Sequence, residues 1–173
     1  AKDALEESVR RVASIALVHE TLAMSSDEVV EFDGIVDRVA AAAAEVASTE
    51  LTVAMRRDGT FGVLPAEVAT SLVMVLNELL LNAVEHGFPP DGTGAATPAT
   101  VVVSAHRFRT QLHVSVADNG RGLPEGFDAG RGGRLGLQIV RALATGELRG
   151  NIELRNRVKG GTEAVLVVPL GRR

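Results

Sequence analysis

The chain has no cysteine, no tryptophan and no tyrosine, and its aromatic content is limited to five phenylalanines among 173 residues. Without cysteine there can be no disulfide framework. No uninterrupted apolar run reaches the length of a membrane span, and no signal-peptide pattern is present. The fold must therefore be held by an apolar core, for which the 46% hydrophobic content of a chain of this length is sufficient.

Clusters of basic residues are also missing. The net charge is -4 at pH 7, whereas a surface that binds nucleic acid needs concentrated lysine and arginine. We therefore expect no nucleic-acid partner, no membrane contact by this chain and a cytoplasmic location. The length predicts one substantial domain with a helical appendage.

A polar stripe runs along an otherwise apolar helical segment between Asn77 and Gly87. Glu78, Asn82 and His86 are spaced four residues apart, so on a helix they lie along one face. A neutral polar group buried without a partner costs about 2–7 kcal/mol. A metal ion and phosphate groups would provide partners, so we expect this face to meet a ligand. The apolar residues around the stripe are Leu72, Val73, Leu76, Leu79, Leu80, Ala83 and Val84.

A second motif is a strand that runs into a turn rich in glycine. Leu112, Val114 and Val116 alternate with less apolar residues, as a half-buried strand requires, and Asp118-Asn119-Gly120-Arg121-Gly122 follows. Because Asn-Gly is also a strong hairpin signal, this motif taken alone is equally compatible with a simple tight turn.

In a third segment, glycines lead directly into an amphipathic helical pattern between Gly130 and Val140. Backbone amides at the start of such a helix point outward, and the positive end of the helix dipole favours a phosphate. One glycine-rich loop is weak support for a nucleotide site. Three segments in this order favour one strongly.

The three segments together resemble the nucleotide-binding domain shared by histidine kinases, DNA gyrase, the Hsp90 chaperones and MutL, the GHKL superfamily. Residues 77–87 are similar to its N box, residues 118–122 to its D-x-G-x-G box and residues 133–137 to its second glycine box. Gly161-Thr162, before an apolar run, resembles its closing G-T strand. The resemblance extends over roughly residues 27–170 and implies the ATP-binding fold of that superfamily.

The resemblance also implies ATP and Mg²⁺ as ligands and assigns roles to single side chains. Asp118 would accept a hydrogen bond from the adenine amino group, with Thr162 beside it. Asn82 would hold Mg²⁺ between the phosphates. Glu78 and His86 would be the catalytic residues: Glu78 would orient or deprotonate near the γ-phosphate, and His86 would lie against the phosphates.

The glycine boxes complete the implied ATP site. Arg134 stands where many histidine kinases have the last glycine of G-x-G-L-G-L, and the lid between Gly122 and Gly136 is short. The further ATP-binding residues expected from the boxes are Gly120, Gly122, Gly133, Leu135, Gly136 and Leu137.

The N-terminal segment Asp3–Ala23 contains no glycine or proline and has a wide apolar face, which predicts a helix packed in a bundle. Residues 14–22 resemble the second helix of the dimerisation pair in the second-type HisKA histidine kinases, the group related to the HWE kinases. The absence of tryptophan favours this group over the HWE kinases, and within it the PdtaS-type sensor kinases are the most similar. The resemblance implies a homodimer through the helix bundle of the full-length protein and a response regulator as partner.

The domain division expected from these patterns places the C-terminal helix of the dimerisation hairpin at residues 1–25 and the catalytic domain at residues 26–173. Because Ala1-Lys2-Asp3 lacks an initiator methionine and falls inside a helical pattern, we expect a fragment of a longer protein.

His19 is the one histidine that suggests a phosphoacceptor, because His19-Glu20 is similar to the start of the acceptor box of ordinary histidine kinases. That box continues into Arg-Thr-Pro and a second long helix, whereas Thr21-Leu22-Ala23 leads to a break. We therefore expect the acceptor upstream of residue 1 and His19 as a residue of the bundle. His106 and His113 are expected to be ordinary surface or edge residues, since no histidine pair has metal-ligand spacing in the sequence.

The remaining periodicities predict an α+β fold, a two-layer α/β sandwich with a mixed sheet, because strands and helices are interleaved without regular alternation. Asp33 is expected to be the N-cap of a helix. The predicted elements are a strand at 27–32, a helix at 35–46, strands at 51–55 and 60–63 around a turn at 57–59, a helix at 66–85, a hairpin of 100–106 with 111–117, a helix at 135–145, and strands at 151–155 and 163–168.

These observations predict the ATP-binding catalytic domain of a cytosolic two-component sensor histidine kinase, which transfers the γ-phosphate of Mg-ATP to an upstream histidine and then to a response regulator. Without that histidine the chain should be inactive alone. One alternative is an anti-sigma-factor serine kinase, whose N box has a similar Glu, Asn and His-Gly. Another is a non-catalytic nucleotide-binding module. The N-terminal helix distinguishes the first alternative, because anti-sigma-factor kinases do not need a dimerisation hairpin.

Overall fold

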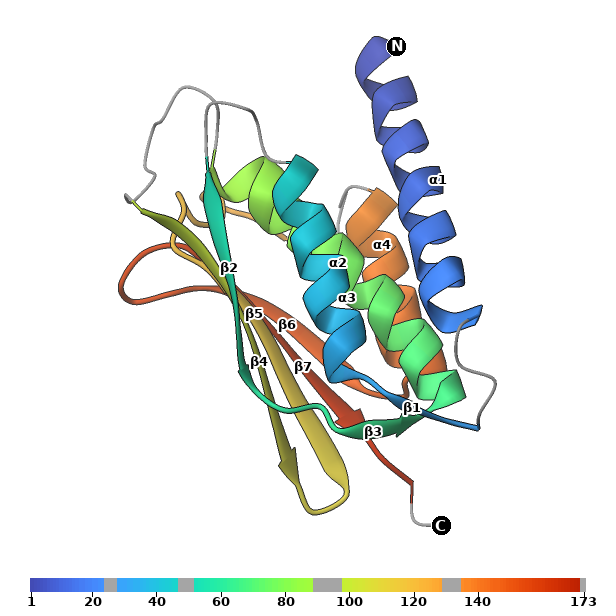
Figure 1. The fold of residues 1–173 in the computed structure, drawn as a ribbon. Helices are drawn as coiled ribbons and strands as arrows, with labels where there is room; N and C mark the ends of the chain where they lie inside the picture. Colours follow the sequence, from blue (N-terminus) through green and yellow to red (C-terminus); the bar gives the residue numbers. More distant parts are fainter. Residues whose placement is uncertain (24–27, 47–51, 89–97, 129–134, 172–173) are drawn as a thin grey trace.

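The computed structural model describes residues 1–23, 28–46, 52–88, 98–128 and 135–171. Helices pack on one face of a five-stranded sheet, and the N-terminal helix lies outside this pair of layers (Figure 1). The elements in chain order are α1 (Lys2–Ala23), β1 (Val29–Glu31), α2 (Asp33–Val46), β2 (Val53–Gly59), β3 (Val63–Pro65), α3 (Ala66–Gly87), β4 (Ala99–Phe108), β5 (Gln111–Asp118), α4 (Leu135–Ala142), the π-helical turn η1 (Leu143–Glu147), β6 (Asn151–Asn156) and β7 (Thr162–Pro169).

The large sheet has the strand order β2-β4-β5-β7-β6. β2 pairs with β4 in parallel, and the other three pairings are antiparallel. β1 and β3 form a separate two-stranded antiparallel sheet. The predicted α+β sandwich with a mixed sheet is therefore confirmed.

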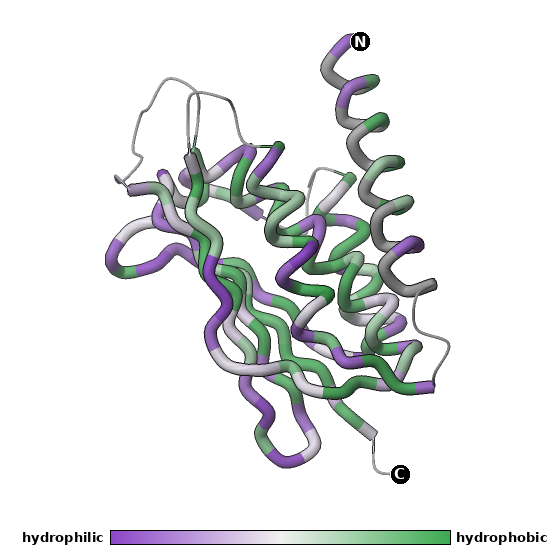
Figure 2. Tube along the Cα trace, viewed as in Figure 1, coloured by the Kyte–Doolittle hydropathy of each residue, from purple (hydrophilic) through white to green (hydrophobic). Residues whose placement is uncertain are grey.

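The core lies between the sheet and helix α3. Buried residues alternate with less buried ones along β5 and along β4 as far as Ala105, so that Val101, Val103, Leu112 and Val114 are buried beneath the helices. α3 is long and apolar enough to cross a membrane by composition, but 72% of its most apolar window is buried inside the molecule. Figure 2 shows that apolar residues, in green, are frequent both in the strands of the sheet and in the helices that pack on it. The core therefore accounts for the apolar character of α3.

The predicted helices and strands are present, with two local differences. The expected turn at residues 57–59 and the expected strand at 60–63 are wrong, because β2 continues through Gly59 in register with β4 and the next strand, β3, begins only at Val63. The predicted N-cap role of Asp33 is wrong, because α2 begins at Asp33 and its first N–H groups donate to the main-chain carbonyl of Phe32. The Asp33 carboxylate instead accepts hydrogen bonds from the main-chain N–H of Phe61 at 2.7 Å and the hydroxyl of Thr60 at 2.5 Å. Asp33 thus ties the start of α2 to the segment between β2 and β3. The break expected at residues 24–26 lies outside the described residues.

The β4–β5 hairpin extends past the helix layer at the lower end of the sheet in Figure 1. Its register places His106 directly opposite His113. Both side chains belong to the outer face of the sheet, because their neighbours Ala105 and Leu112 are buried on the inner face. The expectation that these histidines lie at the surface is confirmed, and the hairpin register brings together two histidines that lie seven positions apart in the sequence.

Candidate functional site

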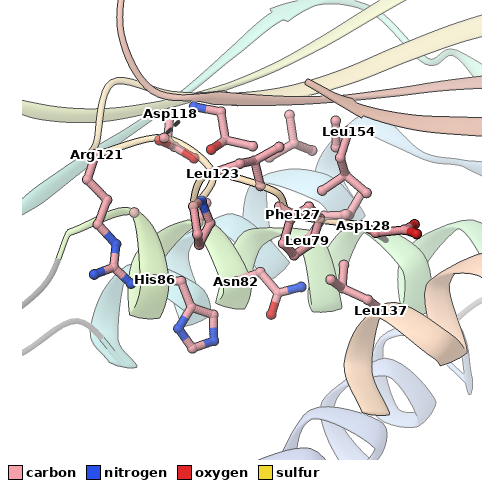
Figure 3. Close-up of a pocket in the computed structure, with 17 residues that line it drawn as sticks. Leu79, Asn82, His86, Asp118, Arg121, Leu123, Phe127, Asp128, Leu137 and Leu154 are labelled. Carbon is pink, nitrogen blue, oxygen red and sulfur yellow. Dashed lines mark hydrogen bonds between the residues drawn. The ribbon is translucent and has the colours of Figure 1, made fainter. Parts of the chain in front are cut away.

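A cavity of about 340 Å³ lies between α3, the end of β5 and the first turns of α4 (Figure 3). It brings together residues from all three sequence motifs, which lie far apart in the chain. The described residues that line it are Leu79, Asn82, Ala83, His86, Gly87, Val116, Asp118, Arg121, Gly122, Leu123, Pro124, Phe127, Asp128, Leu137, Leu154, Thr162 and Ala164.

Asp118 is the buried carboxylate of this cavity, with 4% of its surface exposed. Its Oδ1 accepts hydrogen bonds from the main-chain N–H of Gly120 at 2.9 Å and of Thr162 at 3.2 Å. Burial raises the pKa of Asp118, while these two hydrogen bonds and the charge of Arg157 oppose the rise. Since both bonds end on Oδ1, the carboxylate is fixed in orientation and Oδ2 keeps its capacity to accept a donor from a ligand.

Glycines let three chain segments converge on Asp118. A Cβ at Gly120 would come within 2.0 Å of the carbonyl oxygen of Gly87, and a Cβ at Gly161 within 2.0 Å of the carbonyl oxygen of Asp118. The same Gly87 carbonyl accepts a hydrogen bond from the N–H of Arg121 at 2.9 Å. No side chain fits at these contacts, so the glycines of the D-x-G-x-G box and the G-T strand are explained by close backbone approach.

Asn82 and His86 extend from α3 into the cavity, one helical turn apart (Figure 3). The Nδ2 atom of Asn82 is buried and has no hydrogen-bond partner among the described residues. A buried amide without a partner is costly, about 1–3 kcal/mol, which indicates a site built for a ligand. Glu78, one turn before Asn82, is buried on α3 but is not among the described residues that line the cavity.

The predicted glycine-box residues are distributed unevenly. Gly122, Leu137 and Thr162 line the cavity. Gly120 contributes its N–H to Asp118. Leu135 is 56% exposed at the start of α4 and Gly136 is buried behind it, so within the described residues neither forms the cavity wall. Gly133 lies outside the described residues.

Sequence motifs did not identify the apolar half of the cavity. Leu79, Leu123, Phe127 and Leu154 supply it from α3, from the segment after the D-x-G-x-G box and from β6 (Figure 3). The side-chain oxygen of Asn156 holds that segment by accepting a hydrogen bond from the N–H of Leu123 at 2.7 Å. An apolar slot beside one fixed carboxylate suits a flat heteroaromatic ring that carries a hydrogen-bond donor.

The cavity is compatible with Mg²⁺ only together with a ligand. Among the described residues, no group of three or more His, Cys, Asp or Glu side chains could hold a metal ion. Mg²⁺ usually keeps several waters and binds through one or two protein oxygens plus substrate phosphates. The amide of Asn82, which can rotate to present its oxygen, fits that mode of binding, because its buried end has no other partner in the described residues.

Comparison with known proteins shows the family to which a chain with this cavity belongs. Residues 67–172 match the family model described as "Histidine kinase-, DNA gyrase B-, and HSP90-like ATPase". The chain belongs to this family. Residues 1–47 match a second family model, described as a histidine kinase model of the HisKA_2 type. The chain therefore carries the ATP-binding catalytic module of histidine kinases, preceded by a segment that matches a histidine kinase family model of the second type.

Within this family, the chain is similar to curated sensor histidine kinases. The sensor histidine kinase PdtaS of Mycolicibacterium smegmatis is 48% identical over 173 residues, which are 100% of this chain and 34% of that protein. PdtaS of Mycobacterium tuberculosis is 46% identical over 172 residues. The chain spans about a third of the length of these relatives. The predicted resemblance to PdtaS-type sensor kinases is confirmed, and the anti-sigma-factor kinase alternative is not favoured.

Solved structures of histidine kinases have the same fold. The blue-light-activated histidine kinase of Erythrobacter litoralis matches with a TM-score of 0.77 and 25% identity over 95% of this chain and 54% of that chain. The ATP-binding domain of PrrB from Mycobacterium tuberculosis matches with a TM-score of 0.62 and 28% identity over 84% of this chain and 100% of that chain.

Proposed function

We propose that this chain binds Mg-ATP in the cavity at Asp118 and presents its γ-phosphate to a histidine supplied by a segment outside these 173 residues. The phosphoryl group would then pass to a response regulator. The observation that carries the proposal is the convergence in one cavity of a fixed buried carboxylate, an apolar slot and the Asn82 amide, whose Nδ2 has no hydrogen-bond partner among the described residues. ATP supplies the missing partners, because its base carries a donor amine and its phosphates bring Mg²⁺.

Adenine would lie in the apolar half of the cavity, between the α3 side and the segment that carries Leu123 and Phe127. Its exocyclic amine would donate to Oδ2 of Asp118, because Oδ1 is already engaged by Gly120 and Thr162. Thr162, whose side chain also lines the cavity, would lie beside the base. The apolar walls exclude water, which strengthens the single directional hydrogen bond that selects adenine.

The phosphates would extend along α3, away from Asp118. Asn82 would contribute to holding Mg²⁺, which neutralises phosphate charge when bound, and His86 would contact the phosphates. Glu78 lies one helical turn, about 6 Å, beyond Asn82 in the direction away from Gly87. That position matches the γ-phosphate end of an extended nucleotide, where a carboxylate would orient or deprotonate the attacking imidazole.

The N-terminal part would serve as a dimerisation element, with residues 1–25 as one helix of the hairpin and residues 26–173 as the catalytic domain. On α1, which packs beside α3, the apolar side chains Leu5, Val9, Val12 and Ile15 are 47–67% exposed. Their spacing of three and four residues is that of a coiled-coil seam, so a homodimer of the full-length protein would bury them. A cytoplasmic location fits this assignment.

The proposal is tested by calorimetric titration of the chain with ATP, ADP and GTP in the presence of Mg²⁺. One site per chain with a clear preference for adenine nucleotides is expected. Equal affinity for GTP would remove the assignment of Asp118. Light scattering tests the arm separately: the chain and a version starting at Ser26 should differ in oligomeric state, and a monomer in both cases would count against the dimer.

A further inference from the structure

The outer face of the sheet carries a pair of histidines that the nucleotide site does not use. The chain contains four histidines, and two of them, His106 on β4 and His113 on β5, are direct partners in the antiparallel register. Directly opposed residues of an antiparallel pair have Cβ atoms about 4.5–5.5 Å apart and project from the same face. Their imidazoles therefore extend side by side from the surface.

The His113 imidazole has a hydrogen-bonding neighbour on the outer face of the sheet, and the His106 imidazole lies near β2. Nε2 of His113 is 3.2 Å from Oε1 of Gln111, which precedes it by two residues on the same face of β5. The ring of His106 lies near Gly59 of β2, because a Cβ added at Gly59 would come 3.4 Å from its Cε1. A hydrogen bond that fixes one ring nitrogen sets the tautomer and presents the other nitrogen for ligation.

The strand end that carries the pair is anchored. The tight turn between β4 and β5 uses Arg109 with φ 55°, and its Thr110 carbonyl accepts a hydrogen bond from the N–H of Leu170 at 2.6 Å. Asp58 faces the same side of the sheet, because it pairs with Ser104, two residues before His106. This exposed carboxylate adds negative charge beside the pair and favours a cation there.

We propose that His106 and His113 form a binding site for a divalent transition-metal ion of the imidazole-preferring class, Zn²⁺, Ni²⁺ or Cu²⁺. Neutral imidazole suits these ions, whereas Mg²⁺ and Ca²⁺ prefer oxygen ligands. No group of three His, Cys, Asp or Glu ligands occurs among the described residues, so the two imidazoles bind the ion and water fills its remaining positions. The ion joins β4 to β5 across the hairpin and stabilises the folded chain.

The site is separate from the nucleotide cavity. Asp118 lies five residues beyond His113 on β5, which corresponds to about 17 Å along the strand. The two sites also differ in ion preference, since the nucleotide cavity offers an amide and phosphates. Mg-ATP and the transition metal are therefore expected to bind without competing.

The test is a calorimetric titration of the EDTA-treated, desalted chain with ZnCl₂ and, separately, NiCl₂. The wild type is expected to bind one ion per chain, and His106→Ala and His113→Ala are each expected to lose that binding. His19→Ala is the matched control, because it removes an exposed imidazole of α1 and should leave the titration unchanged. Gln111→Ala is expected to weaken binding by about 10–100-fold while both ligands remain.

A spectroscopic measurement separates ligation from a change in folding. Electron paramagnetic resonance of the chain with one equivalent of Cu²⁺ is expected to show coupling to two imidazole nitrogens in the wild type, and this two-nitrogen signal is expected to be absent in either single variant. Zn²⁺ is expected to raise the Tm of the wild type and of His19→Ala but not that of the His106→Ala, His113→Ala double variant. Stoichiometric binding that survives in the double variant, or that Mg-ATP displaces, would overturn the proposal.

Discussion

Arg157 donates a hydrogen bond from Nη1 to the main-chain carbonyl oxygen of Asp118 at 2.7 Å, across 39 positions in the sequence. The bond joins the turn between β6 and β7 to the end of β5, where Asp118 directs its carboxylate into the cavity. The guanidinium also acts through its charge, which favours the ionised form of Asp118 and opposes the effect of burial on its pKa. Arg157 is therefore a positioning residue for the proposed adenine site.

Arg157→Met is expected to weaken ATP binding by about 0.5–1.5 kcal/mol, because it removes one hydrogen bond and one compensating charge from the support of Asp118. Calorimetric titration with Mg-ATP measures this loss. Arg155→Met is the matched control: Arg155 lies two residues earlier and pairs with Glu163 at the surface at 2.9 Å. An equal loss in both variants would show that Arg157 has no specific role.

Asp118→Asn should reduce ATP affinity by about 1–3 kcal/mol while the fold is retained. The N–H groups of Gly120 and Thr162 require an oxygen at the Oδ1 position, so the variant must direct its amide nitrogen toward the ligand. That nitrogen is a donor and meets the donor amine of adenine. The preference for ATP over GTP should therefore shrink or reverse in calorimetric titrations. Asp58→Asn, on the outer face of the sheet, serves as control, and ATP affinity that stays at the wild-type value in Asp118→Asn would exclude the assigned contact.

The free energy of unfolding should depend on pH in the way that the raised pKa of Asp118 requires. Burial raises its pKa in the folded chain above the ordinary value of 3.8, so the folded state binds this proton more tightly than the unfolded state. Its contribution to the free energy of unfolding is therefore fully present below 3.8 and is lost as the pH rises through the raised pKa. Urea unfolding of the wild type and of Asp118→Asn should show a difference that falls with pH over this window. A difference that rises with pH would require a lowered pKa.

Asn82→Ala should affect the stability of the unliganded protein and its affinity for ATP differently. Removing the buried Nδ2, which has no partner in the described part of the chain, is expected to leave the unliganded Tm unchanged or to raise it. ATP affinity should fall in the presence of Mg²⁺ and change little in EDTA, because the amide acts through the metal. Asn82→Asp keeps an oxygen ligand and should retain the Mg²⁺-dependent part. Equal loss with and without Mg²⁺ would argue against a metal role.

The sequence alone predicted most of the secondary structure, because apolar periodicity is strong in α3, β4 and β5. The resemblance of its motifs to those of the GHKL superfamily also predicted a common site for Asn82, His86, Asp118 and Thr162, and these four residues line one cavity. The same resemblance predicted glycines at the site. Close backbone approach, such as that of Gly120 to Gly87, leaves no alternative residue.

What the sequence did not predict depends on contacts between distant segments. Arg157 and Asn156 support the site through hydrogen bonds that span 39 and 33 positions, and no local pattern marks them. Leu123 and Phe127 form part of the apolar slot, but no pattern in the sequence distinguishes them from ordinary loop residues. The opposition of His106 and His113 follows from hairpin register, which the position of the two-residue turn determines and which spacing rules for metal motifs do not contain.

The most direct measurement of the central claim uses [γ-³²P]ATP with two proteins, the 173-residue chain and a longer protein that includes the preceding segment. The chain alone is predicted to bind ATP without acquiring label. The longer protein should acquire an acid-labile label on a histidine before residue 1, which Glu78→Gln should reduce far more than it reduces ATP affinity. Label on His19 of the isolated chain, or acid-stable label on a serine of an added protein, would contradict the account.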